Sequence, residues 1–333
     1  MLNRNGVSSV KNNLSLIVLL LILMLLLAGM FVYLYSSNMS LKQQVRELKA
    51  AQESAPDTSQ LTVVPKETEP VSIPEAETEP YVVYDNGTER FDFPQAERAL
   101  TRLMPSETKT ITNDGNRRVV TDPDGYKLTR FGIDVSQRQQ VIDWQKVADD
   151  GVTFAYIRMG YRGYETGRMM YDPYFIDNFN GASSAGIDTG VYFFSQAVTE
   201  AEAEQEADYL LNALSEYGFE PDLPIAFRWE QHPSPGEPAR TDDTDGETQT
   251  RCAKAFSDRI KSAGYDCLVY TTVNDAFFRY DIDGFDSGLW IADYGDKCSF
   301  IYDYAILQYS QSGVIDGIEG STELDVMVLP ADE

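Results

Sequence analysis

An uncharged apolar run near the N-terminus constrains this chain more than any other feature of its sequence. The 22 residues from Leu14 to Tyr35 carry no charged side chain, and a helix of that length spans the roughly 30 Å hydrocarbon core of a bilayer. A cleaved signal peptide is the alternative, but its apolar region covers only about 7–15 residues and ends at a small-residue cleavage site. Here the run ends in Phe31-Val32-Tyr33-Leu34-Tyr35, whose aromatic rings suit the membrane interface. We therefore predict a transmembrane helix at residues 14–36.

The segments on either side of this helix bear on its orientation. Basic residues lie on both sides, with Arg4 and Lys11 before the helix and three more soon after it, so the positive-inside rule alone does not decide. The short first segment and the large acidic remainder favour residues 1–13 as a cytoplasmic tail. We predict a single-pass protein of the cell membrane whose C-terminal domain is extracellular.

Residues 37–90 have the composition of a spacer. Leu41, Val45 and Leu48 have helical spacing, which fits either a solvated helical extension or a short coiled coil. Most of the remaining segment is rich in Pro, Glu, Thr and Ser, so it cannot bury enough apolar surface to offset its ordering entropy. We predict a helical extension followed by a disordered stalk.

Residues 91–130 are intermediate in composition. Phe91, Phe93 and Leu103 provide some apolar surface, and Asn113-Asp114-Gly115 is typical of a hairpin turn between two short strands. This segment predicts a small β-rich lead-in to the main domain.

The charge and the reactive residues exclude several classes of protein. With 53 acidic and 27 basic residues, the formal net charge is -26, which opposes binding to nucleic acid. His232 is the single histidine, too few for most zinc enzymes and a weak basis for a Ser-His-Asp triad. Cys252, Cys267 and Cys298 are too few for a disulfide framework, so we expect them to be small buried residues.

After Arg130 the sequence alternates short β-branched or aromatic runs with segments of helix length. This alternation is typical of parallel strands joined by helical crossovers. Capping signals predict one helix from Thr199 through Leu214, closed by Gly218, and another from about 248 to 262. Eight strands suggest a barrel, with its active site at the carboxyl ends of the strands. The predicted strands are 131–135, 153–158, 189–194, 224–229, 266–270, 288–292, 304–308 and 323–326.

Acidic residues occur at or near several of these strand ends, namely Asp134, Glu230, Asp293, Glu323 and Asp325. Converging carboxylates without His or Cys partners point to glycosidic bond cleavage, which needs an acid for the leaving oxygen and a group that stabilises an oxocarbenium-like centre. An isolated strand-end Asp is more often a turn or helix-capping residue. Spacing alone therefore leaves a glycosidase and a structural role open.

Aromatic side chains near the strand ends also have two interpretations. Trp229 and Trp290, together with some of the 20 tyrosines, could offer flat faces on which sugar rings stack. Aromatic residues in such positions are more often part of the core.

A series of motifs follows in order along the main domain. They are FGIDVS at 131–136, GVTFAYIR at 151–158, GYRGY at 160–164, GVYFFSQA at 190–197, WE at 229–230, LWIADY at 289–294 and QYS at 308–310. With these motifs the chain resembles glycoside hydrolase family 25, the muramidases of lysozyme type. The resemblance extends essentially from Phe131 to Val328.

The resemblance implies an α/β fold, an irregular, flattened β/α barrel of the TIM-barrel type at residues 131–333. It also implies cleavage of the β-1,4 bond between N-acetylmuramic acid and N-acetylglucosamine in peptidoglycan, with no metal or organic cofactor. By position, Glu230 matches the general acid of the family, and Asp134 matches its first-strand acidic residue. The residues expected to bind substrate are Arg228, Asp293, Glu323, Tyr192, Trp290 and Tyr161.

Three positions depart from the family pattern. Arg228 replaces the Asp of an Asp-x-Glu motif, Glu323 replaces a late Asp, and Gln140 stands where the family often has Gly, which we expect to narrow the groove. Residues 228 and 230 face the same side of a strand, so Arg228 would favour the ionised form of Glu230, the wrong form for a general acid. Loss of a stabilising group in such a site commonly lowers the rate about 100- to 1,000-fold.

Three functions remain open at this stage. The first is a working peptidoglycan hydrolase that remodels the wall of its own cell, because a membrane tether limits its reach. The alternative is a peptidoglycan-binding protein without catalysis, in which Arg228 pairs with Glu230 or grips a carboxylate of the substrate. A structural protein displayed on the stalk ranks last, because the carboxylates and aromatics of the groove would then have no role.

Overall fold

The computed structural model describes residues 81–85, 90–94, 98–99, 101, 110–114, 117–231, 239–295 and 298–329. The predicted tail, the predicted transmembrane helix and most of the predicted stalk lie outside these ranges, as does His232. Among the helices that the structure describes, none is both long enough and apolar enough to cross a membrane.

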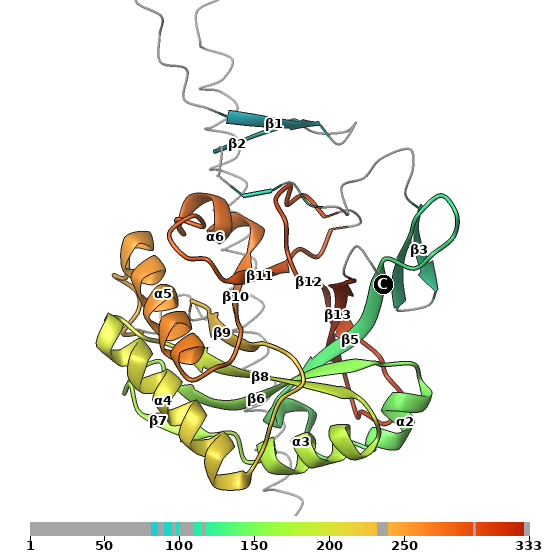
Figure 1. Ribbon diagram of the computed structural model, residues 1–333, viewed down its shortest axis with the longest axis horizontal. Helices are drawn as coiled ribbons and strands as arrows, with labels where there is room; N and C mark the ends of the chain where they lie inside the picture. Colours follow the sequence, from blue (N-terminus) through green and yellow to red (C-terminus); the bar gives the residue numbers. More distant parts are fainter. Residues whose placement is uncertain are drawn as a thin grey trace, which may run out of the picture. The chain divides into compact units, whose positions relative to one another are not determined.

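Within residues 129–328, eight strands close into a mixed barrel (Figure 1). Their order around the barrel is β5-β13-β12-β11-β10-β9-β8-β6, and β6 pairs with β5 to close the ring. The predicted barrel and its eight strands are confirmed. The strands are β5 (Thr129–Val135), β6 (Phe154–Arg162), β8 (Asp188–Ser195), β9 (Ile225–Trp229), β10 (Cys267–Thr272), β11 (Gly288–Ala292), β12 (Ile306–Gly313) and β13 (Thr322–Val328).

The last strand corrects the expectation of parallel strands throughout. β13 is antiparallel to both of its neighbours, β12 and β5, whereas the other neighbouring pairs in the barrel are parallel. Only residues 314–321 connect β12 to β13, and a parallel crossover needs a dozen or more residues. The start of β13 therefore lies beside the end of β5.

Helices cover part of the outside of the barrel, with α3, α4 and α5 along one side in Figure 1. Thr199 caps the start of α4 by accepting a hydrogen bond from the Glu202 amide, and Gly218 ends it in the left-handed conformation with φ 66°. Both predicted helices are thus confirmed. The helices are α2 (Trp144–Asp149), α3 (Phe175–Ser184), α4 (Glu200–Tyr217), α5 (Gly246–Ser262) and α6 (Val273–Phe278), with a 3-10 turn at Gln137–Gln139.

The interior of the barrel is filled by large aromatic side chains. They come from alternate positions of the strands and include Phe154, Tyr156, Tyr192, Tyr270 and Trp290. Two glycines make room for them. A Cβ atom at Gly132 would lie 2.3 Å from the Phe154 ring, and one at Gly190 would lie 2.6 Å from the Tyr156 ring. The opposite faces of the strands pack against the helices and form the larger apolar core.

Two short hairpins precede the barrel. β1 (Tyr81–Asp85) pairs with β2 (Arg90–Pro94), which corrects the prediction of a disordered stalk up to residue 90, because Tyr81–Tyr84 is a run of aromatic and β-branched residues. β3 (Thr110–Asp114) pairs with β4 (Arg117–Thr121) and confirms the predicted hairpin. Its register joins Asp114 to Arg117, so the connection is at residues 115–116.

The lead-in is fastened to the barrel domain by hydrogen bonds. Arg98 donates to the carbonyl oxygens of Ile282, Phe285 and Ser287, and the Thr101 amide donates to the carbonyl oxygen of Ile301 at 2.9 Å. The predicted boundary at residue 130 therefore does not separate two independent bodies.

Two smaller predictions concern the three cysteines and Gln140. Cys252 and Cys267 are buried free thiols, as expected, and Cys298 is half-buried. Gln140 has a φ of 53°, in the left-handed region that favours Gly. Its side chain is exposed and is not among the residues that line the cavity described below, so the expected narrowing of one end of the groove stays a prediction. One more short strand outside the closed ring, β7 (Met169–Tyr171), pairs with the end of β6.

Candidate active site

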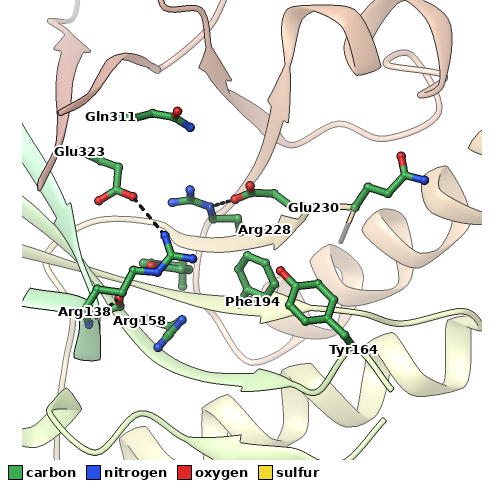
Figure 2. Close-up of a pocket in the computed structure, with 11 residues that line it drawn as sticks. Arg138, Arg158, Tyr164, Phe194, Arg228, Glu230, Gln311 and Glu323 are labelled. Atoms are coloured by element: carbon green, nitrogen blue, oxygen red, sulfur yellow. Dashed lines mark hydrogen bonds and ion pairs between the residues drawn. The ribbon is translucent and has the colours of Figure 1, made fainter. Parts of the chain in front are cut away.

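A cavity of about 170 Å³ opens at the carboxyl ends of the parallel strands, the location expected for an active site in such a barrel. Figure 2 shows its lining residues, which come from β6, β8, β9, β12, β13 and the segments that follow β5, β6 and β9. Of the predicted site residues, the cavity brings together Arg228, Glu230, Glu323 and Tyr192. The full lining is Ser136, Arg138, Arg158, Tyr164, Tyr192, Phe194, Arg228, Glu230, Gln231, Gln311 and Glu323.

Strand β9 places Arg228, which stands where the family motif has Asp, at the centre of this site. Arg228 and the residue directly after the strand, Glu230, point to the same side, as the two-residue period predicts. The Arg228 Nε donates to Glu230 Oε1 in a short ion pair. The Arg228 Nη1 donates to Asp134 Oδ1 at 2.7 Å. One guanidinium thus binds both residues that the sequence assigned to catalysis.

Asp134 lies behind Arg228 and is buried. Its second oxygen, Oδ2, accepts a hydrogen bond from Gln308 Nε2 at 2.6 Å. The Gln308 Oε1 in turn accepts hydrogen bonds from the hydroxyls of Tyr270 at 3.0 Å and Tyr294 at 2.6 Å. Burial raises the pKa of Asp134, although Arg228 and Gln308 oppose the shift. This network fixes Asp134 in place, and Asp134 does not itself line the cavity.

The Arg228 guanidinium is held by aromatic rings as well as by carboxylates. Its central carbon lies 4.2 Å from the ring centre of Tyr270 and 5.3 Å from that of Tyr192, which adds cation–π attraction. Burial is the largest single influence and lowers the pKa of Arg228, but Glu230, Tyr270 and Asp134 together outweigh it and raise this pKa well above its usual value. Arg228 therefore remains a permanent cation inside the barrel.

Strand β13 brings two further carboxyl groups to the same region. Glu323 is the register partner of Asp134 across the β13–β5 pair, and its side chain is 15% exposed. Burial raises the pKa of Glu323 to about 7, and the negative charge of Asp134 adds to the shift. Asp325, two residues further on, is fully buried, and burial raises its pKa well above the ordinary range.

The arrangement provides a pair of carboxyl groups that can reach a ligand. Figure 2 shows the Arg228 guanidinium between the carboxyl groups of Glu323 and Glu230. The Glu230 side chain is 32% exposed, and both glutamates line the cavity. Two such groups on one cavity are what acid–base cleavage of an acetal requires. The described residues contain no group of three or more His, Cys, Asp or Glu that could hold a metal ion.

Three predicted substrate-binding residues lie away from the cavity. The Asp293 carboxylate accepts hydrogen bonds from the amides of Gly295 and Ser299 and so caps its own loop. The Tyr161 hydroxyl contacts the Met170 sulfur at 3.8 Å, and its ring centre lies 5.0 Å from the guanidinium carbon of Arg158. Neither residue is among those that line the cavity, so their contact with substrate stays a prediction.

Trp290 is also misplaced by the sequence prediction, because its ring is fully buried in the barrel interior. Its Nε1 donates to Asp325 Oδ1 at 2.9 Å. The other candidate for sugar stacking, Trp229, is buried too, and its Nε1 donates to the carbonyl oxygen of Ala197 at 3.2 Å. Neither ring offers a face to a sugar, so the core interpretation is correct for both.

Sequence reasoning found Tyr192 but missed the two other aromatic residues that line the cavity, Tyr164 and Phe194. Tyr164 and Phe194 form an edge-to-face pair with ring centres 5.9 Å apart, and Figure 2 shows both rings near Glu230. Each lies within a motif quoted above, GYRGY and GVYFFSQA, but neither motif indicates which aromatic ring faces the cavity. Arg138 and Arg158 were also missed; Arg158 lies within the quoted motif GVTFAYIR, whereas Arg138 lies in none of the quoted motifs.

The sequence matches the family described as Glycosyl hydrolases family 25 over residues 133–318. The autolytic lysozyme of Clostridium acetobutylicum is 30% identical over 200 residues, which cover 58% of this chain and 54% of that protein. Lysozyme M1 of Streptomyces globisporus is 28% identical over 203 residues, which cover 58% of this chain and 65% of that protein. The chain thus spans about half to two thirds of the length of these relatives.

Solved structures show the same barrel. The modular autolysin LytC of Streptococcus pneumoniae, in complex with a synthetic peptidoglycan ligand, has a TM-score of 0.54 and 22% identity, over 65% of this chain and 51% of that chain. A family 25 glycosyl hydrolase of Bacillus anthracis has a TM-score of 0.50 and 18% identity, over 66% of this chain and 97% of that chain. These likenesses concern the fold. Since the family match covers more than half of the sequence, the chain belongs to glycosyl hydrolase family 25.

Proposed function

We propose that this protein is a membrane-anchored peptidoglycan hydrolase of the lysozyme type, which cleaves the β-1,4 bond between N-acetylmuramic acid and N-acetylglucosamine. The observation that carries the proposal is the pair of glutamates, Glu230 and Glu323, which line one cavity at the carboxyl ends of the barrel strands. Cleavage of a glycosidic bond needs one group that gives a proton and one that assists on the other side of the sugar.

The relatives support the choice of substrate. Two of them are named lysozymes, and the LytC structure contains a synthetic peptidoglycan ligand. A cavity with both carboxyl and guanidinium groups suits a glycan that carries hydroxyls, amides and the lactyl or stem-peptide carboxylates of the wall. The net charge of -26 opposes binding to nucleic acid, because the phosphate backbone is also negatively charged.

A direct assay tests this function. The full-length chain in detergent is incubated with purified cell walls, and the release of reducing ends is measured. We expect turnover by the native chain and a loss of at least about 100-fold in Glu230→Gln, because a positioned acid or base contributes that much. Glu204→Gln, an exposed charge on α4, is the matched control and should keep full activity. Equal activity in Glu230→Gln would remove this residue from the mechanism.

One observation favours a second function, binding of peptidoglycan without cleavage. Arg228 replaces a carboxylate of the family motif and binds both Glu230 and Asp134. The lysozyme names of the relatives do not favour this alternative. If it holds, the native chain sediments with cell walls and releases no reducing ends, and Arg228→Asp gains turnover.

We infer the location from the predicted segments at 1–13, 14–36 and 37–90, which would place the barrel outside the cell on a tether near its own wall. Cells expressing the full chain should carry it in the membrane fraction, and external protease should degrade the barrel domain on intact spheroplasts. Finding most of the protein and its activity in the medium would contradict both the anchor and a role in self-remodelling.

A further inference from the structure

We propose that Arg138 is the residue with which this site binds a carboxylate on the muramyl sugar of its substrate, either the lactyl group itself or an acid of the peptide that the lactyl group carries. This role rests on the proposed hydrolase function and deepens it, because it names the group that separates wall glycan from a neutral glycan. Three arginines line the cavity, Arg138, Arg158 and Arg228, and they differ in what they bind.

Two of these guanidinium groups are buried and already paired. The Arg158 side chain is 11% exposed, and its Nε donates to Asp172 Oδ2 at 2.8 Å. Arg228 binds Glu230 and Asp134. A buried guanidinium needs such a carboxylate, because an uncompensated charge in the interior is costly. The charges of Arg158 and Arg228 are therefore compensated within the barrel before any ligand arrives.

Arg138 differs in both exposure and pairing. Its side chain is 69% exposed, and within the described residues its one ionic partner is Glu323, with 3.8 Å between Arg138 Nη1 and Glu323 Oε1. That distance is longer than a hydrogen bond. Burial also raises the pKa of Glu323 to about 7, so its negative charge is only partial near neutral pH. The planar fork of Arg138 thus keeps donors for a carboxylate of a ligand, which a guanidinium binds through two parallel hydrogen bonds.

The backbone that carries Arg138 is held firmly, although its side chain is exposed. Arg138 lies in the 3-10 turn Gln137–Gln139, and its amide donates to Ser136 Oγ at 3.3 Å. The Gln137 amide donates to Asp172 Oδ2 at 2.8 Å, and the buried Gln139 side chain accepts a hydrogen bond from the Ser136 amide at 2.9 Å. A fixed backbone reduces the entropy that is lost when the side chain binds a ligand. Asp172 holds this turn and Arg158 together.

The position of Arg138 also suits the chemistry of the substrate. The proposed reaction breaks the bond at C1 of a muramyl sugar, and the lactyl ether is on C3 of the same ring. A residue that binds this group must therefore lie close to the carboxyl groups of the cavity. Arg138 meets this condition through its 3.8 Å approach to Glu323, and Figure 2 shows Arg138, Arg158 and Glu323 on one side of the cavity and Tyr164 on the other.

A ligand that the proposed reaction leaves intact tests this role on the full chain in detergent. The disaccharide N-acetylglucosaminyl-β-1,4-N-acetylmuramic acid has no bond of the cleaved type, carries a free lactyl carboxylate, and has a neutral counterpart in its lactyl methylamide. Isothermal titration calorimetry measures both affinities. We expect Arg138→Gln to weaken binding of the acid about tenfold, because a charge-assisted hydrogen-bond pair is lost, and binding of the methylamide less than about twofold. Arg138→Lys keeps the charge without the fork and should lie between the native chain and Arg138→Gln.

A second pair of ligands separates the two sources of the carboxylate. In the same disaccharide extended by L-Ala-D-Glu, the lactyl group is an amide and the negative charges are on the peptide, and the bis-methylamide of this compound is neutral. A loss of affinity in Arg138→Gln for the free lactyl acid assigns the lactyl carboxylate as the ligand. A loss for the peptide acid assigns a stem-peptide carboxylate. Either loss, confined to the acid of its pair, supports the proposal.

Two results overturn the proposal. Unchanged affinity of Arg138→Gln for both acids shows that Arg138 does not contact them, and an equal loss for acids and methylamides shows that it only maintains the turn. Arg168→Gln, at an exposed arginine outside the cavity lining, is the matched control and should bind every ligand as the native chain does, with an equal melting temperature. A native chain that shows the Arg138-dependent difference but releases no reducing ends from cell walls overturns the hydrolase function and leaves the carboxylate site standing.

Discussion

Arg228→Met lowers the free energy of unfolding by about 3–5 kcal/mol at pH 7, because removing one partner of a buried ion pair leaves the other charge uncompensated. Met keeps much of the volume of the Arg stem, so the effect reports the lost charge rather than a cavity. The Asp134 carboxylate keeps only the hydrogen bond from Gln308, and Glu230 loses its ion pair. Urea denaturation monitored by tryptophan fluorescence measures the loss.

The loss of unfolding free energy in Arg228→Met should be larger at high pH than at low pH. Without the guanidinium, burial still raises the pKa of Asp134 while the main opposing charge is gone. The folded state of the variant then binds more protons than the unfolded chain over the range in which free carboxyl groups titrate. Stability of the variant relative to the native chain then falls as pH rises. The deficit should be large at pH 7 and smaller at pH 4, near the ordinary carboxyl pKa of about 4.

A matched control separates this effect from loss of any arginine. Arg168 is exposed, and Arg168→Met should change stability by no more than about 0.5 kcal/mol. If Arg228→Met is equally harmless, or if its deficit is the same at both pH values, Arg228 does not compensate the buried carboxylates.

Trp290→Ala is the second substitution with a large expected effect, a loss of about 3–5 kcal/mol in the free energy of unfolding. The ring is fully buried and lies 4.7 Å from the ring centre of Tyr156 and 5.3 Å from that of Tyr270. Truncation would open a cavity at the centre of the barrel and would also remove the hydrogen bond from Trp290 Nε1 to Asp325. Trp290→Phe retains an aromatic ring and should lose less.

Trp290→Phe also separates the two interpretations of Trp290, a core residue and a stacking platform for sugar. A stacking platform for sugar would show as weakened binding of cell-wall glycan with little change in the urea midpoint. If Trp290 is a core residue, the urea midpoint falls, and binding of cell-wall glycan is lost only under conditions in which the barrel unfolds. Denaturation and wall pull-down on the same Trp290→Phe protein decide between them.

Local patterns in the sequence determined the elements of the barrel. Short runs of β-branched or aromatic residues located all eight strands to within a few residues, since such runs between helix-length segments are typical of buried strands. The Thr199 and Gly218 caps fixed the ends of α4, because capping depends on a few neighbouring residues and on one backbone conformation. The ordered motifs identified the family, and the spacing of residues 228 and 230 predicted their shared side of β9. The hairpin of β1 and β2 was missed because the composition around it is that of a spacer.

The tertiary structure alone decided which side chains meet. The antiparallel direction of β13 puts Glu323 beside Asp134, and a strand direction depends on the pairing of segments nearly 190 residues apart, which no local pattern encodes. The same packing buries Trp290 and leaves Tyr164 and Phe194 facing the cavity. It also directs the Asp293 carboxylate to a backbone amide of its own loop. Burial is a property of the closed barrel, and so are the raised pKa values of Asp134 and Glu323. The sequence thus supplied the glutamates and the arginine of the site, and the closed barrel paired Arg228 with Glu230 and placed Glu323 beside Asp134.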